Sequence, residues 1–167
     1  HIRITNKKDI ALMQGTKYIQ SDMTGIFEQL SDDLKAQRAV LFTGTPCQTA
    51  AVLNFVNSKK LPQEKLYLCD IICHGVPSPK VFIDYILWLK ERETFDKYYF
   101  RNKEISWRGD SASVSLDNGI KANKYISSFM SLYYSNLLTD EACFVCKFTT
   151  KERVSDITVS DFWGIED

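Results

Sequence analysis

The sequence of 167 residues predicts a mixed α/β fold, with a central mixed sheet, flanking helices and an antiparallel hairpin portion. The first half of the chain twice repeats a strand, a cysteine-bearing turn and a helix, an order typical of neighbouring parallel strands. In the second half, apolar and polar residues alternate over short segments, as they do in antiparallel strands. We expect residues 1–167 to form a single domain that is a fragment of a longer protein.

The elements of the first half follow from hydrophobic spacing and from helix and turn signals. Ser21 or Asp22 is a suitable cap for a helix that runs to about residue 37, with apolar residues along one side. A short apolar run at 39–42 predicts a buried strand, and helical spacing returns over 48–56.

Residues 65–73 give the strongest strand signal in the chain. They form an almost continuous apolar run between turn residues, which predicts a strand buried on both faces. Ser78 and Pro79 then have the residue types of a helix cap and a first helical residue, so we expect the next helix to begin there.

The elements of the second half are shorter. Alternation predicts strands at 97–101, 111–116 and 120–125, and the sequence Asp117-Asn-Gly119 predicts a hairpin turn between the last two. A helix is expected over 127–138, and a final strand over 156–160.

Composition limits the classes of function. Lys and Arg number 21, and so do Asp and Glu, so the chain has no net charge with which to attract nucleic acid or an anionic membrane. No apolar run is long enough to span a bilayer, and none resembles a signal peptide. We therefore expect a cytoplasmic protein that binds neither nucleic acid nor membrane.

Five cysteines are more than packing alone requires in such a chain. Their odd number argues against a closed disulfide framework, so metal or redox chemistry is the better interpretation. Cys47 lies at a predicted helix start, where unpaired N–H groups favour an anion such as a thiolate. Cys73 ends the strongest predicted strand, and Cys143-x-x-Cys146 has a spacing that lets two sulfurs meet at one metal centre.

Four of these cysteines can form one ligand set. If the strands before Cys47 and Cys73 are neighbours, both sulfurs lie at the same sheet edge, where Cys143 and Cys146 can join them. Four thiolates fit a zinc ion or a [4Fe–4S] cluster, and we favour the cluster because zinc sites more often use two close pairs. Cys69 is assigned to the core.

A thiol-nucleophile enzyme that uses Cys47 and His74 remains a further alternative, although the sequence indicates no third, orienting residue.

Five motifs occur in an order that resembles a known family. They are Gly15-Thr-Lys-Tyr-Ile-Gln-Ser21, Thr43-Gly-Thr-Pro-Cys-Gln48, Cys69-Asp-Ile-Ile-Cys-His-Gly-Val-Pro-Ser-Pro79, Cys143-x-x-Cys-Lys-Phe148 and Ser155-Asp-Ile-Thr-Val-Ser-Asp-Phe-Trp-Gly-Ile165. The chain resembles the coenzyme F420 hydrogenase and dehydrogenase beta subunits, and most closely their bacterial branch, which often accompanies polysaccharide pyruvyl transferases. Members of that branch commonly begin with a ferredoxin-like domain, which this chain lacks, and carry Gly where this chain has Ser160.

The resemblance implies an iron–sulfur flavoprotein oxidoreductase that passes electrons between a [4Fe–4S] cluster and FAD. It assigns the cluster to Cys47, Cys73, Cys143 and Cys146. The implied partners are a redox protein or ferredoxin-like domain and a small-molecule or deazaflavin substrate. The implied flavin contacts are Lys17, Gln20, Gly44, Thr45, Asp161, Trp163 and Gly164. The alternative is a non-catalytic module in which zinc or a cluster only stabilises a larger assembly, and an isolated fragment need not retain either cofactor.

Overall fold

The computed structural model describes residues 1–106 and 111–161. The chain packs as two compact units, each with its own hydrophobic core. The chain passes between the units more than once, so each unit combines segments that are distant in sequence. Unit 1 consists of His1–Arg3, Asp22–His74 and Cys146–Asp167, and unit 2 of Ile4–Ser21 and Gly75–Val145.

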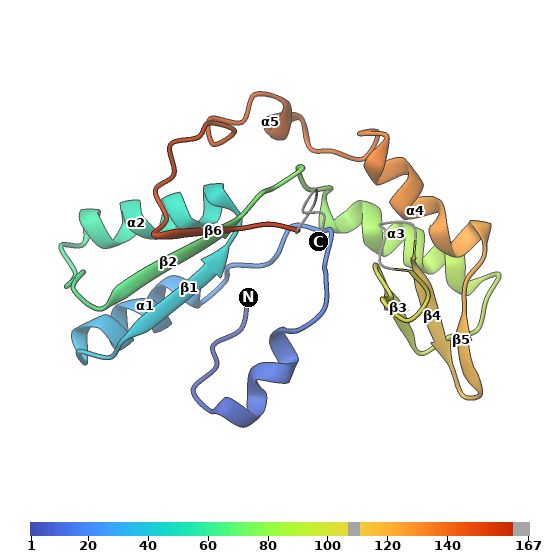
Figure 1. Ribbon diagram of the computed structural model, residues 1–167, viewed down its shortest axis with the longest axis horizontal. Coiled ribbons are helices and arrows are strands. Elements are labelled where there is room, and N and C mark those ends of the chain that lie inside the picture. Colours follow the sequence, from blue (N-terminus) through green and yellow to red (C-terminus); the bar gives the residue numbers. More distant parts are fainter. Residues whose placement is uncertain (107–110, 162–167) are drawn as a thin grey trace, which may run out of the picture. The chain divides into compact units, whose positions relative to one another are not determined.

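Unit 1 is built on a parallel sheet of three strands. β1 (Val40–Gly44) pairs with β2 (Leu66–Ile71), which in turn pairs with β6 (Ile157–Val159), so that β2 is the central strand (Figure 1). The prediction that the two strands of the first half are parallel neighbours is confirmed. β6, the last strand among the described residues, joins the same sheet after the excursion through unit 2.

Two helices of unit 1 cover one face of this sheet. α1 (Ile26–Lys35) and α2 (Pro46–Ser58) pack with the strands around a shared apolar core. α1 begins several residues later than the sequence predicted. The Asp22 carboxylate accepts hydrogen bonds from the backbone N and the hydroxyl of Thr24, at 2.8 and 2.7 Å, and so stabilises a turn instead of a helix start.

The opposite face of the sheet contradicts the prediction that residues 65–73 are buried on both sides. Tyr67 and Ile71 of β2 are 53% and 44% exposed, whereas Leu68 and Asp70 are buried. The reason is topological. Both helices lie on the face of Leu68, and after His74 the chain enters unit 2 instead of placing a crossover helix of unit 1 on the other face.

Unit 2 combines an antiparallel sheet with helices. The strands are β3 (Lys97–Tyr99), β4 (Ser113–Leu116) and β5 (Gly119–Lys121), in that spatial order (Figure 1). The predicted hairpin is confirmed, since β4 and β5 are joined by a two-residue turn. The helical elements are η1 (Lys7–Met13), α3 (Pro79–Lys90), α4 (Lys124–Tyr134) and α5 (Glu141–Phe144).

Local caps explain where the two longer helices of unit 2 begin. As predicted, α3 begins at Pro79 after the cap Ser78, whose hydroxyl accepts from the backbone N of Lys80 at 3.3 Å. α4 begins three residues before the predicted start, because the Asn123 side chain accepts from two backbone N–H groups of the first turn.

The core of unit 2 is rich in aromatic side chains. Phe129 of α4 is 1% exposed and contacts rings from α3 and from the chain near β3. The hydroxyls of Tyr85 and Tyr98 both donate to the carbonyl of Ile126, at 2.8 and 3.0 Å. Burial raises the pKa of both tyrosines, so these hydroxyls remain neutral donors that hold α4 in place.

Within the described residues, no helix combines the length and the apolar composition that crossing a bilayer requires.

Candidate functional site

The carboxyl ends of the parallel strands in unit 1 position two of the predicted cysteines. Because β1 and β2 are parallel neighbours, both end at the same edge of the sheet. Cys47 follows the last residue of β1 by three positions, and Cys73 follows the last residue of β2 by two. The segment after β6, with Ser160 and Asp161, starts from this edge as well.

Cys47 lies in the first turn of α2, because the helix begins at Pro46 and not at residue 48 as predicted. The backbone N of Thr45, the cap residue, donates to Oε1 of Gln48 at 3.0 Å, which fixes the turn between strand and helix. The Thr45 hydroxyl oxygen lies 3.1 Å from the sulfur of Cys47. Cys47 is therefore exposed at a helix N-terminus, with the Thr45 hydroxyl beside its sulfur.

The turn after Cys73 contacts the segment that carries Cys143. Gly75 has a φ of +115°, and a Cβ atom added there would lie 2.7 Å from Cγ2 of Thr139 and 3.4 Å from Cβ of Cys143. Only glycine fits this close approach without strain. Cys143 lies in α5, and Cys146 follows the end of that helix by two residues.

None of the five cysteines forms a disulfide; all are thiols, which is the chemistry that a metal or cluster requires. Cys47 is exposed, and the other four are partly buried. Among residues 1–106 and 111–161, no three His, Cys, Asp or Glu side chains form a group that could hold a metal ion. The four-cysteine ligand set therefore stays a prediction.

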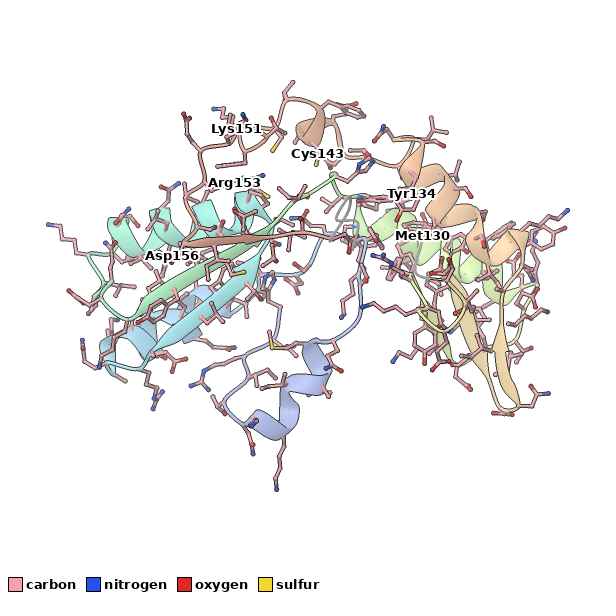
Figure 2. All side chains as sticks on the ribbon, in the orientation of Figure 1. Met130, Tyr134, Cys143, Lys151, Arg153 and Asp156 are labelled. Atoms are coloured by element: carbon pink, nitrogen blue, oxygen red, sulfur yellow. The ribbon has the colours of Figure 1, made fainter. Side chains whose placement is uncertain are left out.

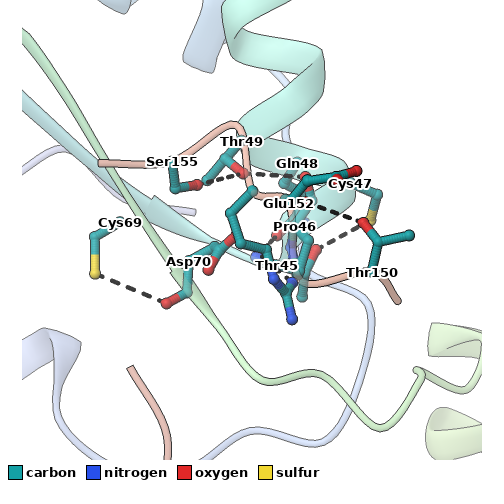
Figure 3. Close-up of polar contacts among 11 residues, drawn as sticks. Thr45, Pro46, Cys47, Gln48, Thr49, Cys69, Asp70, Thr150, Glu152 and Ser155 are labelled. Carbon is teal, nitrogen blue, oxygen red and sulfur yellow. Dashed lines mark hydrogen bonds and ion pairs between the residues drawn. The ribbon is translucent and has the colours of Figure 1, made fainter. Parts of the chain in front are cut away.

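A polar cluster lies behind the cysteine-bearing edge, on the face of β2 that α2 covers. Figure 3 shows its contacts, all of which belong to unit 1. The hydroxyl of Ser155 donates to that of Thr49 at 3.0 Å, and Thr49 donates to the carbonyl of Pro46 at 3.0 Å. Asp70, which is fully buried, forms an ion pair with Arg153, with 3.7 Å between Oδ2 and Nη1.

Sequence reasoning missed this cluster. Its one visible signal was Asp70, a charged residue in the middle of an apolar run that otherwise predicts a buried strand. Its partner Arg153 lies in a loop of mixed charge, where nothing distinguishes it from solvated cations nearby.

Comparison with known families decides the classification. The family model that describes the C-terminal part of the beta subunits of coenzyme F420 hydrogenase/dehydrogenase matches residues 37–167. The chain belongs to this family. The comparison with curated proteins gives no match, and neither does the comparison with solved structures.

Membership in the F420 hydrogenase/dehydrogenase beta-subunit family makes this chain an oxidoreductase module. A family of beta subunits functions in complexes, so protein partners are part of this classification. The match includes the turn at Cys47, the strand before Cys73 and the Cys143–Cys146 segment, so all four predicted ligands lie inside it.

The predicted flavin contacts are distributed over both units. Lys17 is exposed, and its ammonium donates to the carbonyls of Gln14 and Gly15, at 3.2 and 3.0 Å. Gln20 is exposed too, and its backbone N donates to the carbonyl of Pro77.

In unit 1, Gly44 ends β1, Thr45 caps α2 and Asp161 is exposed after β6. Trp163 and Gly164 lie outside the described residues. The flavin assignment therefore stays a prediction.

Proposed function

We propose that this chain is an electron-transfer module in which Cys47, Cys73, Cys143 and Cys146 bind a [4Fe–4S] cluster that exchanges electrons with FAD. The observation that carries the proposal is the position of Cys47 and Cys73 directly after two neighbouring parallel strands, at one sheet edge. Two cysteines that are far apart in sequence can bind one centre without any change of fold when they follow the ends of adjacent parallel strands. The oxidoreductase family supplies the chemical context.

Covalent connectivity supports the inclusion of Cys143 and Cys146. Cys73 precedes Gly75 by two residues, so their Cα atoms are at most about 8 Å apart. Gly75 in turn closely approaches Cys143, within unit 2. Cys146 follows Cys143 at the x-x spacing that lets both sulfurs bind one centre.

The chain's own residues would have distinct tasks at this centre. The four thiolates would hold the iron, and the Thr45 hydroxyl, 3.1 Å from the sulfur of Cys47, would donate a hydrogen bond to that sulfur once it is a thiolate. When bound, a [4Fe–4S] cluster transfers single electrons, and FAD converts these into two-electron chemistry. The module would then exchange electrons with two partners. One is a ferredoxin-like domain or redox protein, and the other is a small molecule or deazaflavin.

Anaerobic reconstitution tests the ligand set. The 167-residue chain is incubated with iron and sulfide, and the bound iron, acid-labile sulfide and visible absorption are measured. We expect about four iron atoms per chain. Cys→Ser substitution at each proposed ligand should reduce this content strongly, whereas Cys69→Ser should not, because Cys69 lies within β2 and outside the proposed set.

The same measurement separates the proposal from a module stabilised by zinc. Stoichiometric zinc, no bound iron after reconstitution and no affinity for FAD would overturn the redox assignment and favour a structural metal. Equal loss of iron in Cys69→Ser and Cys73→Ser would instead show that the ligand set is wrong.

A further inference from the structure

Asp70 and Arg153 form an unusual polar contact in unit 1. Asp70 is 0% exposed, and the Arg153 side chain is 17% exposed. The 3.7 Å between Oδ2 and Nη1 is too long for a hydrogen bond. Both carboxylate oxygens, together with Nη1 of Arg153, have no hydrogen-bond partner among the described residues.

Such a pair is a poor source of stability. Removing two charges from water is costly, and the attraction between them compensates for that cost only when good hydrogen bonds are formed. Replacing a buried ion pair by apolar side chains of similar size is often neutral or stabilising. The presence of this pair therefore points to a task other than holding the fold together.

The location of the pair indicates that task. Asp70 is opposite Gly44 in the sheet register, next to the turn that leads to Cys47, and precedes Cys73 by three residues. Arg153 lies on the segment that runs from Cys146 to β6, where Figure 2 labels it together with Asp156. The pair thus connects the segment that follows Cys146 to the strand that leads to Cys73.

Other contacts already attach the end of this segment. Asp156 exchanges two hydrogen bonds with the backbone of Leu68, at 2.7 and 2.9 Å, and Ser155 bonds to Thr49. β6 is therefore aligned without Arg153. Of the contacts that join this segment to β2 and α2, the one made by Arg153 is the nearest in sequence to Cys146.

We propose that the Asp70–Arg153 pair is a positioning element. It holds the segment after Cys146 so that the sulfur of Cys146 can bind the same centre as Cys47 and Cys73. This inference rests on the proposed cluster function. Neither side chain is a ligand; the pair acts through the backbone that carries the ligands, as residues outside the coordination shell do at other metal sites.

A double substitution separates positioning from stability. In Asp70→Leu/Arg153→Met, both charges are replaced by apolar groups. We expect its urea unfolding midpoint to be close to that of the wild type. After reconstitution with iron and sulfide, we expect it to lose iron to a chelator about 10 to 100 times faster than the wild type. Lys151→Met is the matched control, because it removes an exposed cation from the same segment.

Each outcome has a defined meaning. A double variant that retains iron as well as the wild type would overturn the positioning role and leave the cluster assignment intact. The single variant Arg153→Met leaves the Asp70 charge buried without its partner and should be destabilised. If the double variant has an equally low urea unfolding midpoint, the pair is needed for the fold itself, and the positioning role is overturned. Failure of the wild type to bind iron would overturn the proposed function itself and, with it, this inference.

Discussion

Replacement of Asp33 by asparagine gives the most quantitative test of the forces that hold unit 1 together. Asp33 lies in α1 with its side chain 12% exposed. It accepts two hydrogen bonds from Arg3, both at 2.7 Å, and one from Arg38 at 2.6 Å. The hydrogen bonds from Arg3, assisted by Arg38, outweigh desolvation and lower the pKa of Asp33 from 3.8 to about 2.

The size of the effect follows from linkage. A carboxyl group whose pKa falls from 3.8 to about 2 contributes about 2 kcal/mol to folding at neutral pH. The side chains of Arg3 and Arg38 are 37% and 61% exposed, so solvent screening reduces this to about 1–2 kcal/mol. Because the pKa is lowered in the folded state, this contribution is complete above pH 3.8 and is lost as the pH falls through about 2.

Urea unfolding of the wild type and Asp33→Asn at neutral pH and at about pH 2 measures this contribution. The variant should be less stable by about 1–2 kcal/mol at neutral pH, and the difference should shrink to a few tenths of a kcal/mol at the acidic pH, because about half of the folded-state carboxyl groups are protonated there. Asp32→Asn is the control, because Asp32 is its exposed neighbour in the same helix. A difference that is the same at both pH values would refute the charge-based explanation.

Two further positions test the candidate site. Gly75→Ala should cost about 2–4 kcal/mol, because the new methyl group meets a neighbour at 2.7 Å and the residue has a positive φ. Gly119→Ala, with a φ of +144° but open space around it, should cost about 1–2 kcal/mol, and equal losses in thermal unfolding would exclude the steric effect. Thr45→Val removes the hydroxyl that is 3.1 Å from the sulfur of Cys47 and should lower the reduction potential of the reconstituted centre by roughly tens of millivolts. Thr45→Ser should keep the potential of the wild type, and identical potentials in all three proteins would show that this hydrogen bond has no influence.

Local sequence signals predicted some of the elements whose boundaries depend on a few adjacent residues. Ser78 and Pro79 set the start of α3, and the turn before Gly119 joins β4 to β5, because both features depend on hydrogen bonds and dihedral preferences within one segment. The start of α1 was predicted wrongly because Asp22 has two local uses, a helix cap or a turn, and the sequence alone does not rank them.

The burial of β2 depended on distant parts of the chain. Periodicity indicated an apolar strand correctly, but whether its second face is covered depends on where the following segment goes. The chain leaves unit 1 after His74, and no helix of unit 1 covers Tyr67 and Ile71 among the residues that the structure describes. A sequence pattern describes what a strand can bury, whereas topology decides what covers it.

The sequence by itself determined the chemistry available to this protein: four thiols inside the part of the chain that matches a redox family, and strands that end just before two of them. The tertiary structure alone decided which polar groups surround the sheet edge. Asp70 meets Arg153, and Thr49 meets Ser155, only because β6 returns to pair with β2 after a long excursion. Contacts between residues so far apart depend on strand pairing and packing, which leave no local periodicity in the sequence.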